Sequence, residues 1–157
     1  MEDILFYRCE KCGNTVESIK VGGGILTCCG QEMTKLVANA TDASKEKHVP
    51  VVVKEGEKIK VTVGSINHPM AAEHFIEWIA LATDEKVEIV HLKPGMEPKA
   101  EFAYPSLDVK KIYTGNEDEV VLNCEGQPCN FVYNKPIEKE LIVYAFCNLH
   151  GLWKTEL

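Results

Sequence analysis

The sequence lacks long apolar runs. None of its segments approaches the roughly 20 consecutive apolar residues that a membrane-spanning helix needs. The opening residues, MEDILFYRCEKCG, contain no basic stretch followed by an apolar one, so a secretory signal peptide is not expected. We therefore expect a cytoplasmic protein that does not associate with a membrane.

Positive charge is also in short supply. The 157 residues include 17 Lys and Arg against 24 Asp and Glu, which gives a net charge of −7. This balance argues against nucleic acid as a partner. It also means that an anionic substrate would need a local basic patch to draw it in. Internal repeats and low-complexity tracts are absent from the sequence as well.

Cysteine, in contrast, is plentiful, with seven residues. In a reducing compartment, closely spaced thiols more often hold metals than form disulfides. Four of the seven fall within residues 1–36, a segment that has five glycines and few large apolar side chains. Such a segment cannot bury enough surface to fold without a staple.

The four N-terminal cysteines have the spacing of a metal site. CEKCG supplies Cys9 and Cys12, and CCG supplies Cys28 and Cys29. Two such pairs provide the four thiolates of a tetrahedral site, although adjacent ligands constrain the backbone more than a second C-x-x-C would. Two reducible disulfides are the alternative. Iron and zinc both suit a four-thiolate cage, so the pattern leaves the metal open.

The remainder of the chain predicts a β-sandwich. Residues 37–47, VANATDASKEK, are small and polar and are predicted to form a linker. From residue 48 onward, short β-branched or aromatic runs alternate with turn signals such as EGEK and KPGMEP. Several runs alternate with period two, which favours an antiparallel sandwich over residues 48–157. The expected strands lie within residues 58–64, 74–83, 86–92, 119–124 and 140–147.

All five histidines lie beyond the predicted linker. Cys147 precedes His150 by three residues, a spacing at which both side chains can reach one metal from a turn. Loops and strand ends are where a sandwich carries a functional site. His91 is left out, because it is in phase with Val87 and Ile89 inside a predicted strand. The histidines that we group with Cys147 are His48, His68, His74 and His150.

Six motifs carry a resemblance to a known family. They are FYRCEKCGN, CCGQEM, KEKHVPVV, HPM followed by EHFIEWI, LKPG, and FCNLHGLWK. In order and nearly in spacing, these motifs resemble desulfoferrodoxin, the two-iron class of superoxide reductases. The resemblance runs over about residues 6–98 and resumes over about residues 140–154.

The resemblance implies two irons per chain in an all-β protein. A rubredoxin-like or desulforedoxin-like domain over residues 1–36 would bind the first iron through Cys9, Cys12, Cys28 and Cys29, with zinc as an alternative metal. An immunoglobulin-like sandwich over residues 48–157 would bind the catalytic iron through the four grouped histidines as equatorial ligands and Cys147 as the axial ligand. The implied activity is one-electron reduction of superoxide to hydrogen peroxide without oxygen release. A rubredoxin-type electron donor and a homodimer are implied as well.

Two residues beside His48 are predicted to assist the reaction. Lys47 would draw superoxide toward the metal and help to deliver a proton through water, which matters more in a chain of negative net charge. Glu46 matches the family carboxylate that closes the sixth coordination position in the resting ferric state. As a residue of a flexible linker, Glu46 is expected to swing in and out.

The chain departs from the family by an insertion at about residues 104–139, which carries Cys124 and Cys129 in NCEGQPCN. These two cysteines are either small residues of a strand-loop-strand excursion or a redox-active pair that responds to peroxide. Two other functions remain open from the sequence alone. One is a non-catalytic metal-binding or storage protein, and the other is an electron carrier that uses only the four-cysteine centre.

Overall fold

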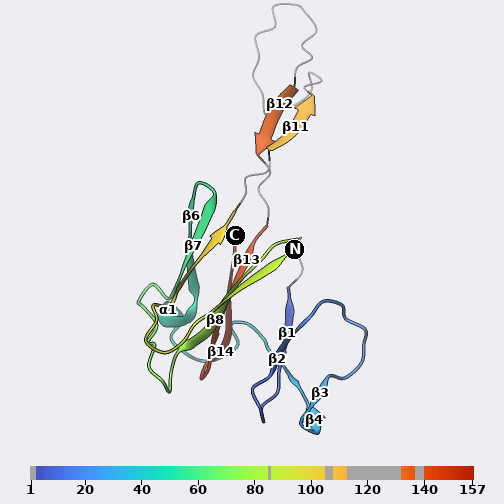
Figure 1. The fold of residues 1–157 in the computed structure, drawn as a ribbon, viewed down its shortest axis with the longest axis vertical. Coiled ribbons are helices and arrows are strands. Elements are labelled where there is room, and N and C mark those ends of the chain that lie inside the picture. Colours follow the sequence, from blue (N-terminus) through green and yellow to red (C-terminus); the bar gives the residue numbers. More distant parts are fainter. Residues whose placement is uncertain (1–2, 85, 105–107, 113–131, 137–139) are drawn as a thin grey trace, which may run out of the picture.

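A computed structural model describes residues 3–84, 86–104, 108–112, 132–136 and 140–157 of the chain. Within these ranges the regular structure is almost entirely β, with one short helix, α1 (Lys45–His48). Figure 1 shows a small N-terminal part, drawn in blue, beside a larger sandwich. The prediction of an all-β fold, with a small metal domain followed by an immunoglobulin-like sandwich, is confirmed.

The N-terminal part consists of very short strands. One sheet has the order β2-β1-β5, and β3 pairs with β4 in a separate hairpin. The bounds are β1 (Leu5–Arg8), β2 (Thr15–Ser18), β3 (Thr27–Cys28), β4 (Gln31–Glu32) and β5 (Thr34–Lys35). Among its described residues, only Phe6, Cys9 and Met33 are buried. This part therefore has almost no hydrophobic core of its own.

The sandwich has two antiparallel sheets, one of order β10-β7-β6 and one of order β14-β13-β8-β9. The first contains β6 (Pro50–Glu55), β7 (Lys58–Val63) and β10 (Lys99–Ala103). The second contains β8 (Ile76–Ala82), β9 (Val87–His91), β13 (Ile142–Cys147) and β14 (Gly151–Glu156). The strands expected within residues 58–64, 74–83, 86–92 and 140–147 are thus confirmed, whereas 119–124 lies outside the described residues.

The alternation of buried and exposed residues in β7 explains how this sheet covers the core. Ile59, Val61 and Val63 are at most 1% exposed, whereas Lys58 and Lys60 point to solvent. The alternation arises because successive side chains of a strand project to opposite faces. The buried face of β7 packs against β8 and β13 in one apolar cluster.

Strand β13 is buried on both faces. Val143, Ala145 and Cys147 face the sandwich interior, whereas the alternate residues Tyr144 and Phe146 belong to a second apolar cluster. Phe6 of the N-terminal part joins that second cluster. The outer face of the four-stranded sheet is therefore covered by the N-terminal part, and β13 reads as an uninterrupted apolar run for this reason.

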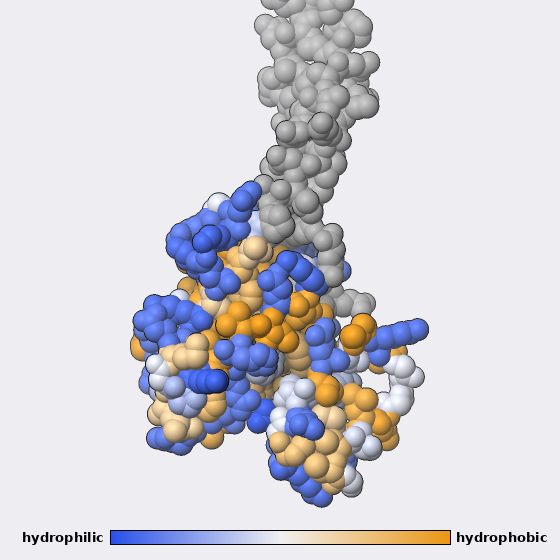
Figure 2. Space-filling model, in the orientation of Figure 1, coloured by the Kyte–Doolittle hydropathy of each residue, from blue (hydrophilic) through white to orange (hydrophobic). Residues whose placement is uncertain are grey.

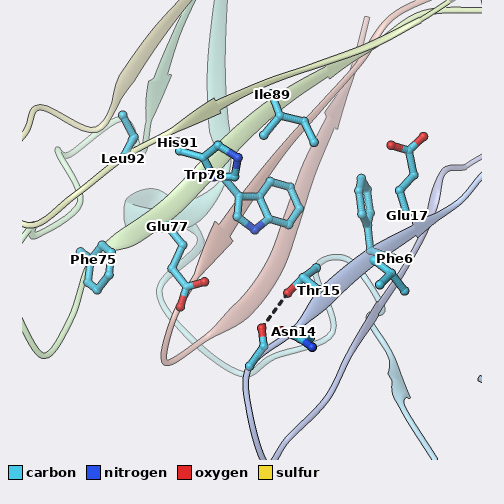
Figure 3. Close-up of a pocket in the computed structure, with 12 residues that line it drawn as sticks. Phe6, Asn14, Thr15, Glu17, Phe75, Glu77, Trp78, Ile89, His91 and Leu92 are labelled. Atoms are coloured by element: carbon cyan, nitrogen blue, oxygen red, sulfur yellow. Dashed lines mark hydrogen bonds between the residues drawn. The ribbon is translucent and has the colours of Figure 1, made fainter. Parts of the chain in front are cut away.

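Charged contacts also hold the two parts together. The guanidinium of Arg8 donates to both carboxylate oxygens of Glu77 at 3.1 and 3.2 Å and lies 4.8 Å from the centre of the Phe146 ring. A cleft of about 490 Å³ opens beside this contact, between β1–β2 and β8–β9. Figure 3 shows Trp78 and His91 on its wall. None of the predicted metal ligands lines this cleft.

The predicted linker is more ordered than a tether. Asn39 pairs with β14: its amide donates to the Lys154 carbonyl at 3.3 Å and accepts from the Lys154 N–H at 3.0 Å. Residues Lys45–His48 form α1, so His48 ends a helix rather than opening a strand. No helix is predicted here from the sequence, because a single turn is too short to show helical periodicity.

The insertion contains a two-stranded ribbon, in which β11 (Asp108–Ile112) pairs antiparallel with β12 (Val132–Pro136). Figure 1 shows the ribbon beyond the end of the sandwich. Cys124 and Cys129 lie outside the described residues, so both interpretations of this pair stay predictions. Among the described residues, no helix has the length and apolar character needed to cross a membrane.

Candidate metal centres

The four N-terminal cysteines converge on one point. Their sulfur atoms all lie within 4.8 Å of one another. The Cys12 and Cys28 sulfurs are 3.6 Å apart, and those of Cys28 and Cys29 are 3.9 Å apart. A tetrahedral ion with metal–sulfur bonds of about 2.3 Å has sulfur–sulfur edges of about 3.8 Å, whereas a disulfide needs about 2.0 Å. The four thiols are free, and their spacing fits a metal rather than the disulfide alternative.

A tight turn shapes the first cysteine pair. The Gly13 N–H donates to the Cys9 carbonyl at 2.8 Å, and the Cys9 N–H donates to the Asn14 carbonyl at 2.8 Å. Gly13 has φ +77°, a conformation that costs glycine little because it lacks a Cβ. The chain thereby reverses around Cys9 and Cys12 and points both sulfurs to the same side.

The adjacent pair needs a different device. Consecutive residues in an extended chain project in opposite directions, so two neighbouring thiols do not normally meet. Cys29 adopts φ +51°, and Gly30 follows with φ +74°. The left-handed turn at Cys29 brings its sulfur back beside that of Cys28. A non-glycine residue in this region is strained, which is typical of functional sites.

Crowding shapes the acidity of these thiols. Hydrogen bonding from the Cys12 backbone N–H lowers the pKa of Cys9 to about 7. Contact with the Cys12 sulfur raises the pKa of Cys28 and raises that of Cys29 to about 12. One thiolate is therefore readily formed, and each further negative charge is opposed by the first. A bound cation removes this opposition, and so metal binding and thiol ionisation are coupled.

The second cluster gathers four histidines and Cys147, with all ligand atoms within 4.8 Å of one another. The rings follow one another in the order His48, His68, His74, His150, with neighbouring centres 4.6–4.8 Å apart and neighbouring planes 74–81° apart. The ring centres of His48 and His74, which lie at opposite corners of this arrangement, are 6.1 Å apart. A diagonal longer than the edges describes a square of imidazoles.

Hydrogen bonds select the nitrogen that each ring presents. Nδ1 of His48 donates to the Ser44 carbonyl at 2.7 Å, and Nδ1 of His68 donates to the Pro69 carbonyl at 2.6 Å. The Nε2 atoms of His68 and His74 are buried without a partner. Such orphaned nitrogens are costly unless a ligand satisfies them.

The distances between donor atoms suit a metal as well. Nε2 of His48 lies 2.9 Å from Nδ1 of His150, and the Cys147 sulfur lies 3.6 Å from the same Nδ1. Two equatorial nitrogens at about 2.1 Å from a metal are about 3.0 Å apart. Among the described residues, no sixth His, Cys, Asp or Glu joins the cluster. Five donors leave one position of an octahedron open.

Burial sets the protonation of this site. It lowers the pKa of His68 to about 4 and also lowers the pKa values of His48 and His74, because charged imidazolium is disfavoured away from water. These rings are therefore neutral at pH 7, the form that binds metals. Burial raises the pKa of Cys147, so its thiolate requires a cation beside it.

Three elements carry the five donors. His48 comes from α1, His68 and His74 from the connection between β7 and β8, and Cys147 and His150 from the hairpin between β13 and β14. The hairpin has a three-residue loop followed by Gly151 at φ +73°, which is a common hairpin geometry. The donors therefore meet at one end of the sandwich.

Asn148 ties two of these elements together. Its side-chain oxygen accepts from the Phe75 N–H at 2.9 Å, and its side-chain nitrogen donates to the Glu73 carbonyl at 3.0 Å. Its backbone N–H donates to the Phe75 carbonyl at 3.1 Å. Asn148, in the hairpin that carries Cys147, thus binds the residues on both sides of His74 in the sequence.

Lys47 and Glu46 are exposed residues of α1. The positive charge of Lys47 contributes to lowering the pKa values of both His48 and His74, so it acts on opposite sides of the square. The Glu46 carboxylate lies outside the ligand cluster and accepts from the Ser44 hydroxyl at 3.0 Å. The Glu46 carbonyl is bound by the Ile66 N–H at 3.1 Å, so its backbone is anchored, unlike that of the expected flexible linker.

All nine predicted ligand residues are brought together in two groups, whereas His91 joins neither. That the nine bind metal remains a prediction. Sequence reasoning missed Ser44, Asn148 and Trp153. The indole of Trp153 is fully buried and stacks on His48, with ring centres 4.9 Å apart. Asn148 and Trp153 both lie in the motif FCNLHGLWK, and their position beside two ligands was the available signal.

Comparison with known proteins agrees with this geometry. Residues 2–36 match the family model described as desulfoferrodoxin, N-terminal domain, and residues 40–156 match that described as desulfoferrodoxin. A desulfoferrodoxin homolog from Archaeoglobus fulgidus is 41% identical, with 95% of this chain and 94% of that protein covered. Desulfoferrodoxin from Syntrophotalea carbinolica is 40% identical, with 99% and 98% covered.

A solved structure is similar along its whole length. It is the superoxide reductase from Treponema pallidum, which matches with a TM-score of 0.63 and 26% identity over 98% of this chain and 99% of that one. The family models together span nearly the entire sequence, and both metal-ligand clusters fall inside them. The chain belongs to the desulfoferrodoxin family.

Proposed function

We propose that the protein is a superoxide reductase, which reduces superoxide by one electron to hydrogen peroxide without releasing oxygen. The observation that carries the proposal is the square of four imidazoles with a buried thiol as fifth donor. A ferrous ion held there would supply the electron, and the thiolate would increase electron density at the open position. The family and the Treponema pallidum structure support the assignment.

Lys47 supplies the electrostatic attraction in this proposal. Superoxide is an anion, and the chain has a net charge of −7, so the average field repels it. The ammonium of Lys47 lies close enough to affect both His48 and His74. It would attract the anion to the open position and orient water that delivers a proton. Glu46 would act as the carboxylate that closes this position in the oxidised resting state.

Iron is the proposed metal of both centres, one ion in each. Three histidine nitrogens with low pKa values and a thiolate suit ferrous iron at the five-donor cluster. The four-cysteine cluster fits iron and zinc equally, and visible absorption distinguishes them, because ferric thiolate is coloured and zinc thiolate is not. A colourless protein would favour the second candidate function, a non-catalytic metal-binding or electron-carrier protein.

The proposed setting is a cytoplasmic homodimer that receives electrons from a rubredoxin-type donor and protects against superoxide. Apolar side chains exposed on the N-terminal part support self-association. These are Ile19, Val21, Ile25 and Leu26, which are 95%, 65%, 71% and 40% exposed. Figure 2 shows hydrophobic surface on this lobe as well as on the sandwich above it. Light scattering of the purified protein tests the dimer.

The decisive test of the activity uses pulses of superoxide on protein loaded with ferrous iron. We expect one peroxide formed for each superoxide consumed in the presence of a reductant, with no oxygen released. Protein loaded with zinc at both centres is the control and should leave superoxide to its spontaneous decay. Oxygen release at half the superoxide consumed would indicate dismutation and overturn the proposal.

The role of Lys47 is tested by Lys47→Ala with Lys45→Ala as the matched control. Both lysines are exposed on α1, and both substitutions change the net charge equally. We expect Lys47→Ala to lower the second-order rate constant with superoxide by about tenfold and to weaken its salt dependence. Lys45→Ala should have a much smaller effect. Equal effects of the two substitutions would remove Lys47 from the mechanism.

A further inference from the structure

We propose that Ser44 is a positioning residue that keeps the Glu46 carboxylate away from the open coordination position. The inference rests on the proposed function, because it concerns control of access to the same site. It assigns to Ser44 a role in exchanging the internal carboxylate for an external anion. Two separate hydrogen bonds of Ser44 and the anchoring of the Glu46 backbone support this role.

The Ser44 hydroxyl is used in an uncommon way. Ser44 occupies the N-cap position of α1, where serine usually accepts a hydrogen bond from a backbone N–H of the first turn. Here the side chain makes no capping bond. The hydroxyl instead donates to Oε1 of Glu46 at 3.0 Å. The carboxylate is therefore held at the start of the helix, outside the cluster of ligand atoms.

The Ser44 carbonyl has a different task. It accepts from Nδ1 of His48 at 2.7 Å and thereby directs Nε2 toward the other donors. Ser44 thus orients a ligand through its backbone and holds the carboxylate through its side chain. A substitution that removes the hydroxyl leaves the carbonyl in place, so the two roles can be separated.

The Glu46 backbone cannot follow its side chain. Its carbonyl accepts from the Ile66 N–H at 3.1 Å and from the Ser65 hydroxyl at 3.2 Å. Only rotation about the side-chain bonds can therefore move the carboxylate. In this proposal the carboxylate exchanges between two environments, the Ser44 hydroxyl and the open position of the centre to which His48, two residues further along α1, contributes a donor.

These two environments compete, and the Ser44 bond favours the open site. Hydrogen bonds to charged groups are stronger than those between neutral groups, although exposure to water weakens this one. Loss of the hydroxyl should raise the fraction of molecules in which the carboxylate closes the site. An external anion binds only to molecules in which the site is open, so its apparent dissociation constant rises as the open fraction falls.

Azide binding to the ferric protein measures this competition. We expect Ser44→Ala to raise the dissociation constant for azide about fivefold, followed by visible absorption. Ser44→Thr retains a hydroxyl and should restore a value near that of the wild type. In a Glu46→Ala background, Ser44→Ala should have no effect, since no carboxylate remains to be held.

Ser65→Ala is the matched control. It also removes a serine hydroxyl from Glu46, but from a backbone carbonyl that still accepts from Ile66. We expect its azide affinity to equal that of the wild type. A general disturbance of α1 would instead change the affinity in Ser65→Ala and Ser44→Ala alike, and that result would overturn the inference.

Two further outcomes decide the matter. An unchanged dissociation constant in Ser44→Ala, or an equal change with and without Glu46, would overturn the role of Ser44 while the activity with superoxide stayed intact. A wild-type ferric protein that neither absorbs as an iron–thiolate nor binds azide would overturn the proposed function itself, and this inference with it.

Discussion

The two clusters of donors differ in what holds them. Cys12 and Cys29 are exposed, and they lie in a part of the chain with only three buried residues among those described. His48, His68 and Cys147 are 2%, 3% and 0% exposed, and Cys147 belongs to the sandwich core. A metal bound at the first centre would have to organise the chain, whereas the donors of the second centre are already held by the packing around them.

The difference follows from where the ligands are anchored. The four-cysteine site depends on a glycine turn and on the strained φ of Cys29, and neither is stabilised by much packing. The five-donor site is braced by Asn148 and by the stack of Trp153 on His48. It is also braced by the loop after β7, where the Ile66 N–H donates to the Glu46 carbonyl of α1. Rigid support of this kind suits a catalytic site, because the open position must persist without a ligand to define it.

Metal removal should break the comparison most visibly. In protein stripped with a strong chelator, we expect amide protection in residues 9–30 to fall by more than about a hundredfold, since structural metal sites contribute folding energy directly. Protection in β8 and β13 should change by less than about tenfold, because their core contacts involve no metal. Hydrogen exchange read by mass spectrometry gives both values in one sample.

Restored metal provides the control, and refilling should return the protection of residues 9–30 to its starting level. The opposite pattern, with the N-terminal part protected and the sandwich unprotected after stripping, would contradict the view that the four-cysteine centre depends more on its metal than the five-donor centre does.

Gly64→Ala should produce the next largest effect, this time at the five-donor centre. Gly64 has φ +82°, and a Cβ there would meet the Lys47 carbonyl oxygen at 2.7 Å and the Ile66 carbonyl oxygen. We expect a loss of about 3 kcal/mol in the free energy of unfolding, from strain and overpacking together, measured by denaturant titration. Displacement of α1 should also weaken metal binding through His48.

Gly56→Ala is the matched control, because Gly56 also has a positive φ, +59°, but a Cβ there would meet no atom within 4 Å. It reports the backbone strain alone, and we expect about 1 kcal/mol with unchanged metal affinity. Equal losses from the two substitutions would mean that the loop does not brace α1.

The sequence predicted which donor residues come together better than it predicted the contacts that hold them in place. Spacing alone grouped Cys9 with Cys12 and Cys147 with His150, since chemistry at close range is local. The alternation of Ile59, Val61 and Val63 likewise predicted β7 and its buried face. The boundaries at residues 36 and 47 stay predictions.

The missed features depend on contacts between residues far apart in sequence. Asn148 binds Glu73 and Phe75 across the sandwich, and Gly64 fits beneath Lys47 only after α1 has folded onto it. The burial of β13 on both faces requires Phe6 from the other part of the chain. Such pairings cannot be read from a single sequence without knowing the fold.

Asn148→Ala tests the bracing of His74. The substitution removes two side-chain hydrogen bonds to the segment that carries this histidine. We expect metal affinity at the five-donor centre to fall by about 10-fold to 100-fold, as is usual when an outer partner of a ligand is lost. Competition with a chromogenic chelator measures it. Asn148→Asp keeps the acceptor for the Phe75 N–H and should give an intermediate loss.

An asparagine that bridges backbone groups of β14 instead of those beside His74 supplies the control. Asn39 also binds two backbone groups, both of Lys154, and has φ +58°. Asn39→Gly tolerates this φ and should lower stability without changing metal affinity. Unaltered affinity in Asn148→Ala would place the bracing elsewhere.

The smallest expected effect concerns hydrogen bonds between Tyr144 of the sandwich and the N-terminal part. The Tyr144 hydroxyl accepts from the Ile4 N–H at 3.0 Å and donates to Asp3 at 3.1 Å. Tyr144→Phe should cost about 1 kcal/mol at pH 7. Burial raises the pKa of Tyr144 to about 12, above its ordinary value of 10. Between these values the unfolded chain ionises first and binds fewer protons, so stability falls as pH rises.

This sign makes the alkaline response diagnostic. Wild-type protein should lose up to about 2 kcal/mol through Tyr144 between pH 10 and pH 12, measured by urea denaturation. Tyr144→Phe lacks the ionising group and should lose correspondingly less, so the stability curves of the two proteins converge as pH rises and, at the full loss, cross before pH 12. Parallel curves would mean that Tyr144 ionises equally in both states. The N-terminal part would then be held to the sandwich by Phe6 and by the Arg8–Glu77 contact, without an anchor through the Tyr144 hydroxyl.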